Sequence, residues 1–241
     1  MRVDYGLDAP GVVRGFALAG AALAVVTVAL VVLGVPGLPE LTGLSAVMFV
    51  ATVAAMLHSS RRGKLVERDR LLDALDLRGD EVVLDVGCGR GLLLVGAAKR
   101  LPGGRAVGVD VWSAKDQSAN SRAATLANAE AEGVGDRVEV LDGDTRDLPF
   151  ADASFDVVVS SLAIHNVHEA DDRERACFEI ARVLRPGGRV AVLDLRATGE
   201  YMRAFEDAGL TGVARSGRSF RMYPPVRVVT ARRPAPLYEG G

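Results

Sequence analysis

EVVLDVGCGRG, residues 81–91, is the most informative segment of the chain: an apolar strand runs directly into glycines at every second position. At a strand-to-helix turn, glycine removes the Cβ that would keep a ligand away from the backbone, and the N–H groups of the next helix face that ligand. The dinucleotide fingerprint would require its third glycine where Leu92 stands. The segment therefore predicts a ligand-binding turn, and it disfavours an NAD site.

Short apolar runs alternate with helical stretches after this turn, a pattern typical of a doubly wound parallel sheet. The expected strands are 81–86, 105–110, 137–141, 155–160 and 189–195, with helices near 91–100, 122–132, 169–184 and 201–208. Two further strands, at 212–220 and 226–231, are separated by Tyr223, Pro224 and Pro225. This connection is too short for a parallel crossover, so the last pair is predicted to be antiparallel.

Apolar residues are concentrated in the first sixty positions. Residues 15–33 are nearly all Ala, Val, Leu, Gly and Phe, which at about 1.5 Å per residue is enough to cross a hydrocarbon core of roughly 30 Å. The segment GVPGLPE (34–40) breaks this helix, and a second uncharged run follows at 41–57. The connection contains no Lys or Arg, whereas Arg61 and Arg62 follow the second run. The positive-inside bias therefore predicts a membrane hairpin with both ends in the cytoplasm.

Two other interpretations of this region are less favoured. A cleaved signal peptide does not account for the second apolar run, and no later segment offers apolar faces that would bury such a hairpin inside a soluble protein. After it, residues 61–75 show an amphipathic helical pattern. We expect the following division of the chain: a two-helix membrane anchor at 1–60, an amphipathic linker helix at 61–80, a soluble ligand-binding domain at 81–233 and a loose tail at 234–241.

Charge and cysteine content limit the classes of partner. The formal net charge is -2, so the chain has no overall basic field with which to hold a nucleic acid. Cys88 and Cys177 are the only cysteines and lie in different contexts, one in a glycine turn and one in a helical stretch. We therefore expect no disulfide framework and a reducing compartment.

The segment VLDVGCGRG resembles the first motif of the class I S-adenosylmethionine-dependent methyltransferases. The resemblance implies that the turn holds the methionine part of S-adenosylmethionine, and that a carboxylate at the end of the second strand accepts hydrogen bonds from both ribose hydroxyls. It also implies a Rossmann-like α/β fold with a seven-stranded sheet in the order 3-2-1-4-5-7-6, strand 7 being antiparallel. The residues assigned to the cofactor in this way are Asp85, Gly87, Cys88, Gly89, Gly91 and Asp110.

Further motifs of the same family follow in order. Val111 and Trp112 stand where the family contacts adenine, although Trp112 is equally explained as a core residue. DGDTRDLPF resembles the third motif and implies that Asp144 and Thr145 contact the adenine amino edge. FDVVVSSLAIHN, which contains Ser160, resembles the fourth motif beside the transferable methyl, and LRPGGRVAVLDL completes the set. The resemblance covers about residues 80–233.

Methyl transfer from a sulfonium needs mainly alignment and exclusion of water. No catalytic base is strictly required. If one is used, His165 or His168 is the candidate, with His165 preferred, because imidazole titrates near neutral pH and this segment leaves the fourth strand. The alternative is a residue at the start of a helix that bonds to Asn166 or to the backbone. A metal site involving His165 and His168 is disfavoured, since no second ligand cluster is visible, and we expect no metal.

The absence of two sequence features limits the class of acceptor molecule. The chain has no [DN]-P-P-[FY] segment, which disfavours amide and exocyclic nitrogen acceptors, and two cysteines are too few for an arsenic methyltransferase. A membrane anchor would bring the domain close to lipophilic acceptors. We therefore expect a small acceptor of lipid or quinone-like type, methylated at the cytoplasmic face of the cell membrane. The alternatives are a catalytically inactive, membrane-tethered sensor of S-adenosylmethionine and an NAD-linked reductase. The polar segment Ser113–Ser121 either folds over the cofactor or is a solvated loop.

Overall fold

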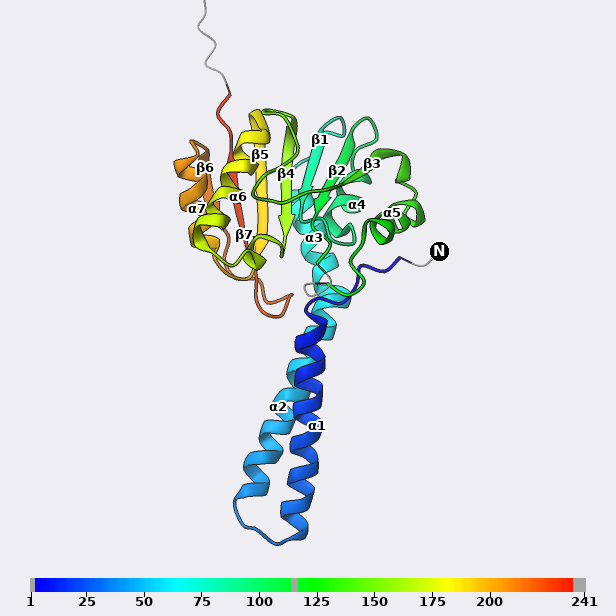
Figure 1. Ribbon diagram of the computed structural model, residues 1–241, viewed down its shortest axis with the longest axis vertical. Coiled ribbons are helices and arrows are strands. Elements are labelled where there is room, and N and C mark those ends of the chain that lie inside the picture. Colours follow the sequence, from blue (N-terminus) through cyan, green and yellow to red (C-terminus); the bar gives the residue numbers. More distant parts are fainter. Residues whose placement is uncertain (1–2, 114–116, 236–241) are drawn as a thin grey trace, which may run out of the picture.

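Two long helices project as a hairpin from one end of an α/β domain in the computed structural model (Figure 1), which describes residues 3–113 and 117–235. The helices are α1 (Pro10–Val32) and α2 (Leu38–His58). Phe16 and Phe49 meet edge to face with their ring centroids 5.4 Å apart. The Thr27 hydroxyl donates to the Thr42 hydroxyl at 2.8 Å. These contacts join the two helices along their length.

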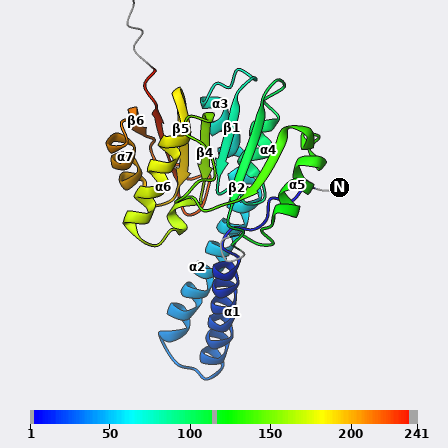
Figure 2. The ribbon, with the colours of Figure 1, turned by 45° about the horizontal axis from the view of Figure 1, so that its top comes forward.

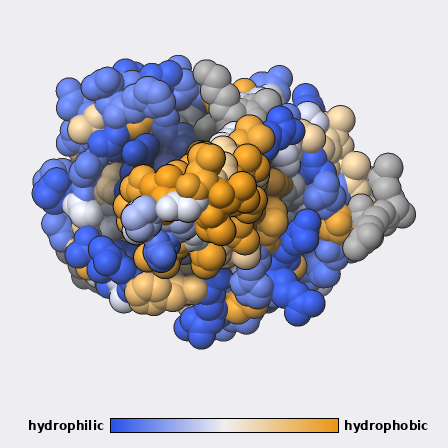
Figure 3. Space-filling view, turned by 90° about the horizontal axis from the view of Figure 1, so that it is seen from below, coloured by the Kyte–Doolittle hydropathy of each residue, from blue (hydrophilic) through white to orange (hydrophobic). Residues whose placement is uncertain are grey.

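Most of the apolar surface of the hairpin is uncovered. Both helical stretches are long and apolar enough to cross a membrane, and only 6% and 11% of the residues in their most apolar windows are buried. Seen from its far end, the hairpin is an orange, apolar projection in front of a mainly hydrophilic face (Figure 3). The buried-core interpretation of this region is therefore not supported, because such helices would be largely covered.

The second helix of the hairpin continues into the α/β domain without a break in helical structure. A π-helical turn at Ser59–Gly63 joins α2 to α3 (Lys64–Ala74). A Cβ on Gly63 would overlap the carbonyl oxygen of Arg221, so only glycine permits the close approach of residue 221 at this turn. The amphipathic helix expected at 61–80 is thus an extension of α2, and it ends at Ala74.

The sheet has seven strands in the order β3-β2-β1-β4-β5-β7-β6, as predicted. Strand β7 is antiparallel to both β5 and β6, which confirms the inference from the short final connection. The strands are β1 (Val82–Val86), β2 (Arg105–Asp110), β3 (Val138–Asp142), β4 (Phe155–Ser161), β5 (Leu184–Asp194), β6 (Thr211–Arg215) and β7 (Arg227–Arg232).

Helices cover both faces of the sheet (Figure 2). One face carries α3, α4 (Leu92–Ala98) and α5 (Arg122–Ala131), and the other carries α6 (Ala170–Val183) and α7 (Thr198–Asp207). Two short 3-10 turns, at 135–137 and 164–166, complete the described elements. On β4, Val157 and Val159 face the first helical layer and Val158 faces the second, as the period of two in a strand requires.

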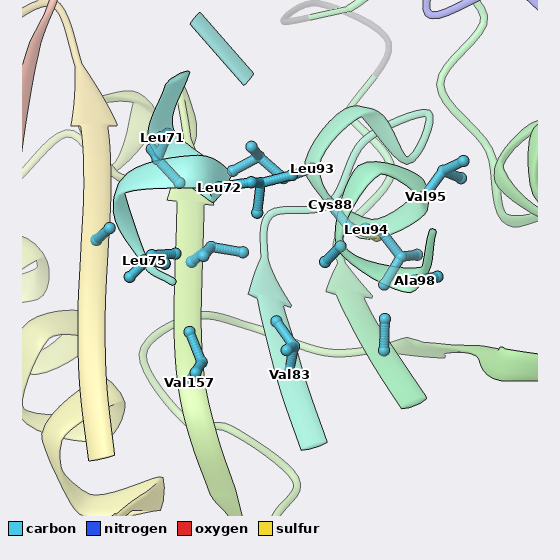
Figure 4. Packing of buried hydrophobic residues seen from close by; sticks show 14 of the residues in the cluster. Leu71, Leu72, Leu75, Val83, Cys88, Leu93, Leu94, Val95, Ala98 and Val157 are labelled. Atoms are coloured by element: carbon cyan, nitrogen blue, oxygen red, sulfur yellow. The ribbon is translucent and has the colours of Figure 1, made fainter. Parts of the chain in front are cut away.

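Helix α3 belongs to the core of the α/β domain. Leu71 and Leu72 are buried, and Figure 4 shows Leu72 beside Leu93 of α4, above the strands. A Cβ on Gly96 would come within 2.9 Å of Leu72, so α3 and α4 are closely packed. The hairpin is therefore attached to the domain through a packed helix.

Two expected boundaries are wrong. Strand β5 begins at Leu184 instead of residue 189, because the segment predicted as a turn forms a bulge: Leu184 pairs with Phe155 and Arg189 pairs with Val157. Strand β6 ends at Arg215, and residues 216–226, the β6–β7 loop, connect it to β7. The predicted strand at 212–220 extended too far because its second half contains Gly217 and three polar residues, which leave the sheet.

Candidate cofactor and acceptor site

The turn between β1 and α4 has a backbone conformation that glycine adopts most readily. Gly87, Gly89 and Gly91 have φ angles of 72°, 53° and 84°. A Cβ on Gly87 would overlap the Cβ of Ala163, so the turn also packs against the segment that follows β4. Burial raises the pKa of the intervening Cys88 thiol, which fits a small turn residue and argues against a nucleophile.

Asp85 lies at the end of β1, beneath this turn, with 2% of its surface exposed. Its Oδ2 accepts a hydrogen bond of 2.8 Å from the Leu94 N–H. The pKa of Asp85 is raised to about 8: burial raises it most, the hydrogen bond from Leu94 lowers it, and the charge of Asp110 adds to the increase. A cation placed in the adjoining space would favour the ionised form and lower this pKa.

Asp110 connects the end of β2 to the glycine turn. Its Oδ2 accepts from the Gly89 N–H at 2.7 Å, and its Oδ1 accepts from the Trp112 N–H at 2.6 Å and from Asn120 Nδ2 at 3.2 Å. The Asn120 Oδ1 is buried and has no hydrogen-bond partner among the described residues. A carboxylate and an unpaired amide oxygen side by side are suited to accept hydrogen bonds from a pair of hydroxyls.

The rim beside Asp110 is formed by the residues expected to contact adenine. Val111 is 63% exposed. Asp144 is bound to Arg146 at 2.6 Å, and this hydrogen bond lowers the pKa of Asp144. Trp112 donates from Nε1 to Asp142 at 2.6 Å and packs partly against the core. Asp144 and Thr145 line the same cavity as Asp110.

Ser160 differs from its expected placement. It is fully buried, its hydroxyl donates to the Val86 carbonyl at 2.7 Å, and it is absent from the cavity wall. Because successive side chains on a strand face opposite sides, the next residue, Ser161, reaches the cavity instead. Gly91 also lies outside the lining, where it begins α4.

His165 is held by a carboxylate that the motif comparison did not identify. Its Nδ1 lies 2.7 Å from Oδ1 of Asp194, at the end of β5. Asp194 is fully buried, and its Oδ2 accepts from the Tyr201 hydroxyl at 3.0 Å and from the His165 N–H at 3.1 Å. Burial and the charge of Asp194 raise the pKa of Tyr201, so its hydroxyl stays a donor. The backbone of His165 is thereby fixed, and its Nδ1 lies close to the carboxylate, although no described residue forms a hydrogen bond with that nitrogen.

An N-terminal segment, Val3–Ala9, packs over the glycine turn. The Arg90 guanidinium donates to the Asp4 carbonyl at 2.7 Å, and Gln117 bridges the Arg90 N–H to the Tyr5 carbonyl at 2.9 and 3.0 Å. Residues 117–121 therefore fold over the turn, whereas residues 114–116 of the same polar segment lie outside the described residues. The buried Lys64 ammonium donates to the Tyr5 and Gly6 carbonyls.

One cavity of about 680 Å³ unites these features. All the expected site residues except Gly91 and Ser160 line it. The base of the hairpin contributes Val12 and Met56, and the β6–β7 loop contributes Met222 and Tyr223. Among the described residues, no group of three His, Cys, Asp or Glu side chains is arranged to hold a metal ion.

Three features of the site were not predicted from sequence: Asp194 beside His165, and the contributions of Asn120 and the N-terminal segment to the cavity wall. Asp194 stands in the quoted motif LRPGGRVAVLDL, at the carboxyl end of a parallel strand. Ligand-binding residues gather at the carboxyl ends of strands in such sheets, so the position of Asp194 could have indicated its role in the site. No sequence pattern indicated that the N-terminal segment reaches the site, because its partners Lys64 and Arg90 are more than fifty residues away in the sequence.

Residues 84–192 match the protein family described as "Methyltransferase domain". Among curated proteins, the chain is similar to the "Ubiquinone/menaquinone biosynthesis C-methyltransferase UbiE" of Dinoroseobacter shibae, with 40% identity over 129 residues, 54% of this chain and 48% of that protein. It is also similar to the "Nocamycin O-methyltransferase" of Saccharothrix syringae, with 40% identity over 124 residues, 51% of this chain and 41% of that one. The chain thus spans about half the length of these relatives.

Solved structures share the fold. The geranyl diphosphate C-methyltransferase of Streptomyces coelicolor A3(2), solved with Mg²⁺, geranyl diphosphate and S-adenosyl-L-homocysteine, superposes with a TM-score of 0.54 at 17% identity. The match covers 70% of this chain and 80% of that one. The family match, the relatives and the glycine-turn geometry agree: residues 84–192 match a methyltransferase domain, and S-adenosylmethionine is the cofactor that these comparisons support.

Proposed function

We propose that the chain is a membrane-anchored methyltransferase that transfers a methyl group from S-adenosylmethionine to a small lipophilic acceptor. One observation carries the proposal: the cavity that contains the glycine turn and Asp110 is also lined by Val12 and Met56, at the base of the apolar hairpin. A molecule dissolved in a bilayer around the hairpin would meet the cavity at this base.

The hairpin supports the membrane part of the proposal. Helices α1 and α2 have 23 and 21 residues, which at about 1.5 Å per residue matches a hydrocarbon core of roughly 30 Å. The connection at 33–37 has no charged residue, whereas Arg61 and Arg62 lie just beyond α2. The positive-inside bias then puts the methyltransferase domain on the cytoplasmic side of the cell membrane.

The residues around the glycine turn fit the cofactor. Gly87 and Gly89 line the cavity, where a backbone without side chains can approach the methionine part closely. Asp110 and the unpaired Asn120 oxygen are acceptors for the ribose hydroxyls. Val111 and Thr145 would border the adenine. When bound, S-adenosylmethionine supplies an activated methyl on a sulfonium, so the protein has mainly to orient the acceptor and exclude water.

His165 is the proposed base. Asp194 faces Nδ1 at 2.7 Å, which favours a proton on Nδ1 and leaves Nε2 free to accept a proton from an acceptor hydroxyl or an acidic carbon. The acidic partner also stabilises the imidazolium that forms when that proton is taken. Asp194 thereby acts as a positioning residue, and it is itself fixed by the Tyr201 hydroxyl.

The nature of the acceptor is supported by the wall opposite the glycine turn. Val12, Met56, Met222 and Tyr223 make this part of the cavity apolar or amphipathic. Two similar proteins are named for methylation in ubiquinone or menaquinone biosynthesis and of demethylmenaquinone. A quinone-like or other isoprenoid acceptor is consistent with both observations.

The test is transfer of radiolabelled methyl from S-adenosylmethionine in membranes that contain the full chain. We expect label in the lipid extract, its loss in Asp110→Ala, and a strong reduction in His165→Gln. His58→Gln is the matched control, because His58 is exposed at the end of α2 and does not line the cavity. Cofactor binding without any labelled product would instead indicate a sensor. Binding of NADH but not of S-adenosylhomocysteine would indicate a reductase.

A further inference from the structure

The β6–β7 loop exposes large aromatic side chains between basic ones. Phe220 is 78% exposed and Tyr223 is 45% exposed. Arg218 and Arg221 flank Phe220, and both are exposed. Such a combination is unfavourable in water for Phe220, but it is typical of segments at membrane interfaces, where aromatic rings lie at headgroup level and arginines contact lipid phosphates.

Specific contacts hold this loop at the end of the hairpin. The Tyr223 N–H donates to the Ser59 hydroxyl at 2.9 Å, and the Ser219 hydroxyl donates to Glu67 on α3. Gly63 packs directly against the Arg221 carbonyl. The loop is therefore fixed to the π-helical turn that follows α2.

These contacts set the level of the loop relative to a bilayer. Helix α2 ends at His58, and its 21 residues span about 30 Å, the thickness of a hydrocarbon core. Ser59 therefore lies at the boundary between hydrocarbon and headgroups. In Figure 1 the orange loop between β6 and β7 descends to the base of the hairpin.

The surroundings of the loop are mainly cationic. Arg61 and Arg62 are exposed on the π-helical turn, and none of the ion pairs among the described residues involves them or Arg218. The nearby acidic side chains are paired with basic residues: Glu67 lies 3.7 Å from Arg221, and Asp8 lies 3.1 Å from Lys64. The face seen around the hairpin in Figure 3 is largely hydrophilic.

We propose that the β6–β7 loop is a second membrane contact, which inserts Phe220 and Tyr223 into the interface of an anionic bilayer while Arg61, Arg62 and Arg218 bind lipid headgroups. The occupant of this surface is the bilayer itself. The inference relies on the anchor in the proposed function, but it does not depend on the methyl transfer.

The experiment uses the full chain in vesicles of phosphatidylcholine and phosphatidylglycerol with brominated acyl chains, which quench tryptophan at close range. The signal is the fluorescence of Phe220→Trp after subtraction of the parent chain, which contains Trp112 only. The matched control is Phe178→Trp. Phe178 is 41% exposed on α6 and lies near Pro186, at the opposite end of β5 from the cavity.

We expect strong quenching of Phe220→Trp and none of Phe178→Trp. Adding Arg218→Gln to Phe220→Trp should weaken the contact about fivefold, because each basic residue near an anionic surface contributes about that factor. A larger reduction is expected when phosphatidylglycerol is omitted, because Arg61, Arg62 and Arg218 then all lose their anionic partners. If the chain stays in the membrane during carbonate extraction but tryptophans at positions 220 and 178 are quenched equally, the inference is overturned. Release of the chain by carbonate would refute the anchor, and with it this inference.

Discussion

Replacing Gly87 with alanine tests whether the glycine turn is limited by space or only by backbone conformation. Gly87 and Gly209 have nearly the same positive φ, 72° and 79°, so alanine at either position costs about 1–2 kcal/mol of left-handed backbone strain. Nothing lies within 4 Å of a Cβ on Gly209, whereas a Cβ on Gly87 would overlap Ala163. Overpacking of this kind adds about 1–3 kcal/mol, so Gly87→Ala should lose about 2–5 kcal/mol in total.

The assay combines thermal unfolding of the full chain with calorimetric binding of S-adenosylhomocysteine. A loss of 1 kcal/mol lowers Tm by about 2–4 °C in a protein of this size, so Gly87→Ala should unfold roughly 4–20 °C lower, with weakened binding. Gly209→Ala should lose about 2–8 °C and bind normally. The double variant Gly87→Ala with Ala163→Gly removes the overlapping Cβ and should recover binding. Equal losses for the two single variants, or no recovery in the double variant, would refute the reasoning.

Three further outcomes are expected. Glu81 is buried, which raises its pKa, but hydrogen bonds from the Arg78 N–H and other donors lower it to about 2. Its contribution to stability is complete above about pH 4.5 and is lost as the pH falls toward 2, so Glu81→Gln should flatten the pH dependence of the denaturant midpoint over that range. Asp85 has a pKa of about 8 and is therefore mainly protonated at pH 7, so binding of the cationic S-adenosylmethionine should release a proton from it. The calorimetric binding enthalpy should then differ between buffers. Asp85→Asn should remove this difference. Met56→Trp should raise the KM for the lipophilic acceptor without changing the Kd of S-adenosylhomocysteine, whereas Val50→Trp, on the exposed side of α2, should change neither.

The sheet was predictable because local signals agree with one another. Each parallel strand is a short apolar run bounded by turn residues, and the connection through Pro224 and Pro225 is too short for a crossover, so the antiparallel pair followed from length alone. The predicted strand boundaries were wrong where one sequence feature is compatible with two different structures. The glycines at 187 and 188 are compatible with a turn or with a bulge inside a strand, and only the pairing of Leu184 with Phe155 distinguishes them.

The candidate site was predictable only where it is built from contiguous segments. The glycine turn and Asp110 are each marked by a strand that ends in a polar residue. Ser160 and Ser161 are adjacent, and which of them faces the cavity depends on the register of β4 in the sheet, which the sequence does not contain. His165, in the turn after β4, and Asp194, at the end of β5, are 29 residues apart in the sequence, so their approach depends on the pairing of the two strands.

The unbroken helical path from α2 through the π-helical turn into α3 has a mechanical consequence. Because α3 is packed into the domain core, and Met56 and Ser59 line the cavity, no flexible tether separates the cavity from the hairpin, and the cavity is held at a constant height beside the end of α2. In a bilayer the enzyme would search for its acceptor by diffusing in two dimensions at a fixed height. Only molecules whose reactive atom reaches that height would be methylated, so the rigid attachment of the hairpin would itself select among lipids by the depth of their reactive atom.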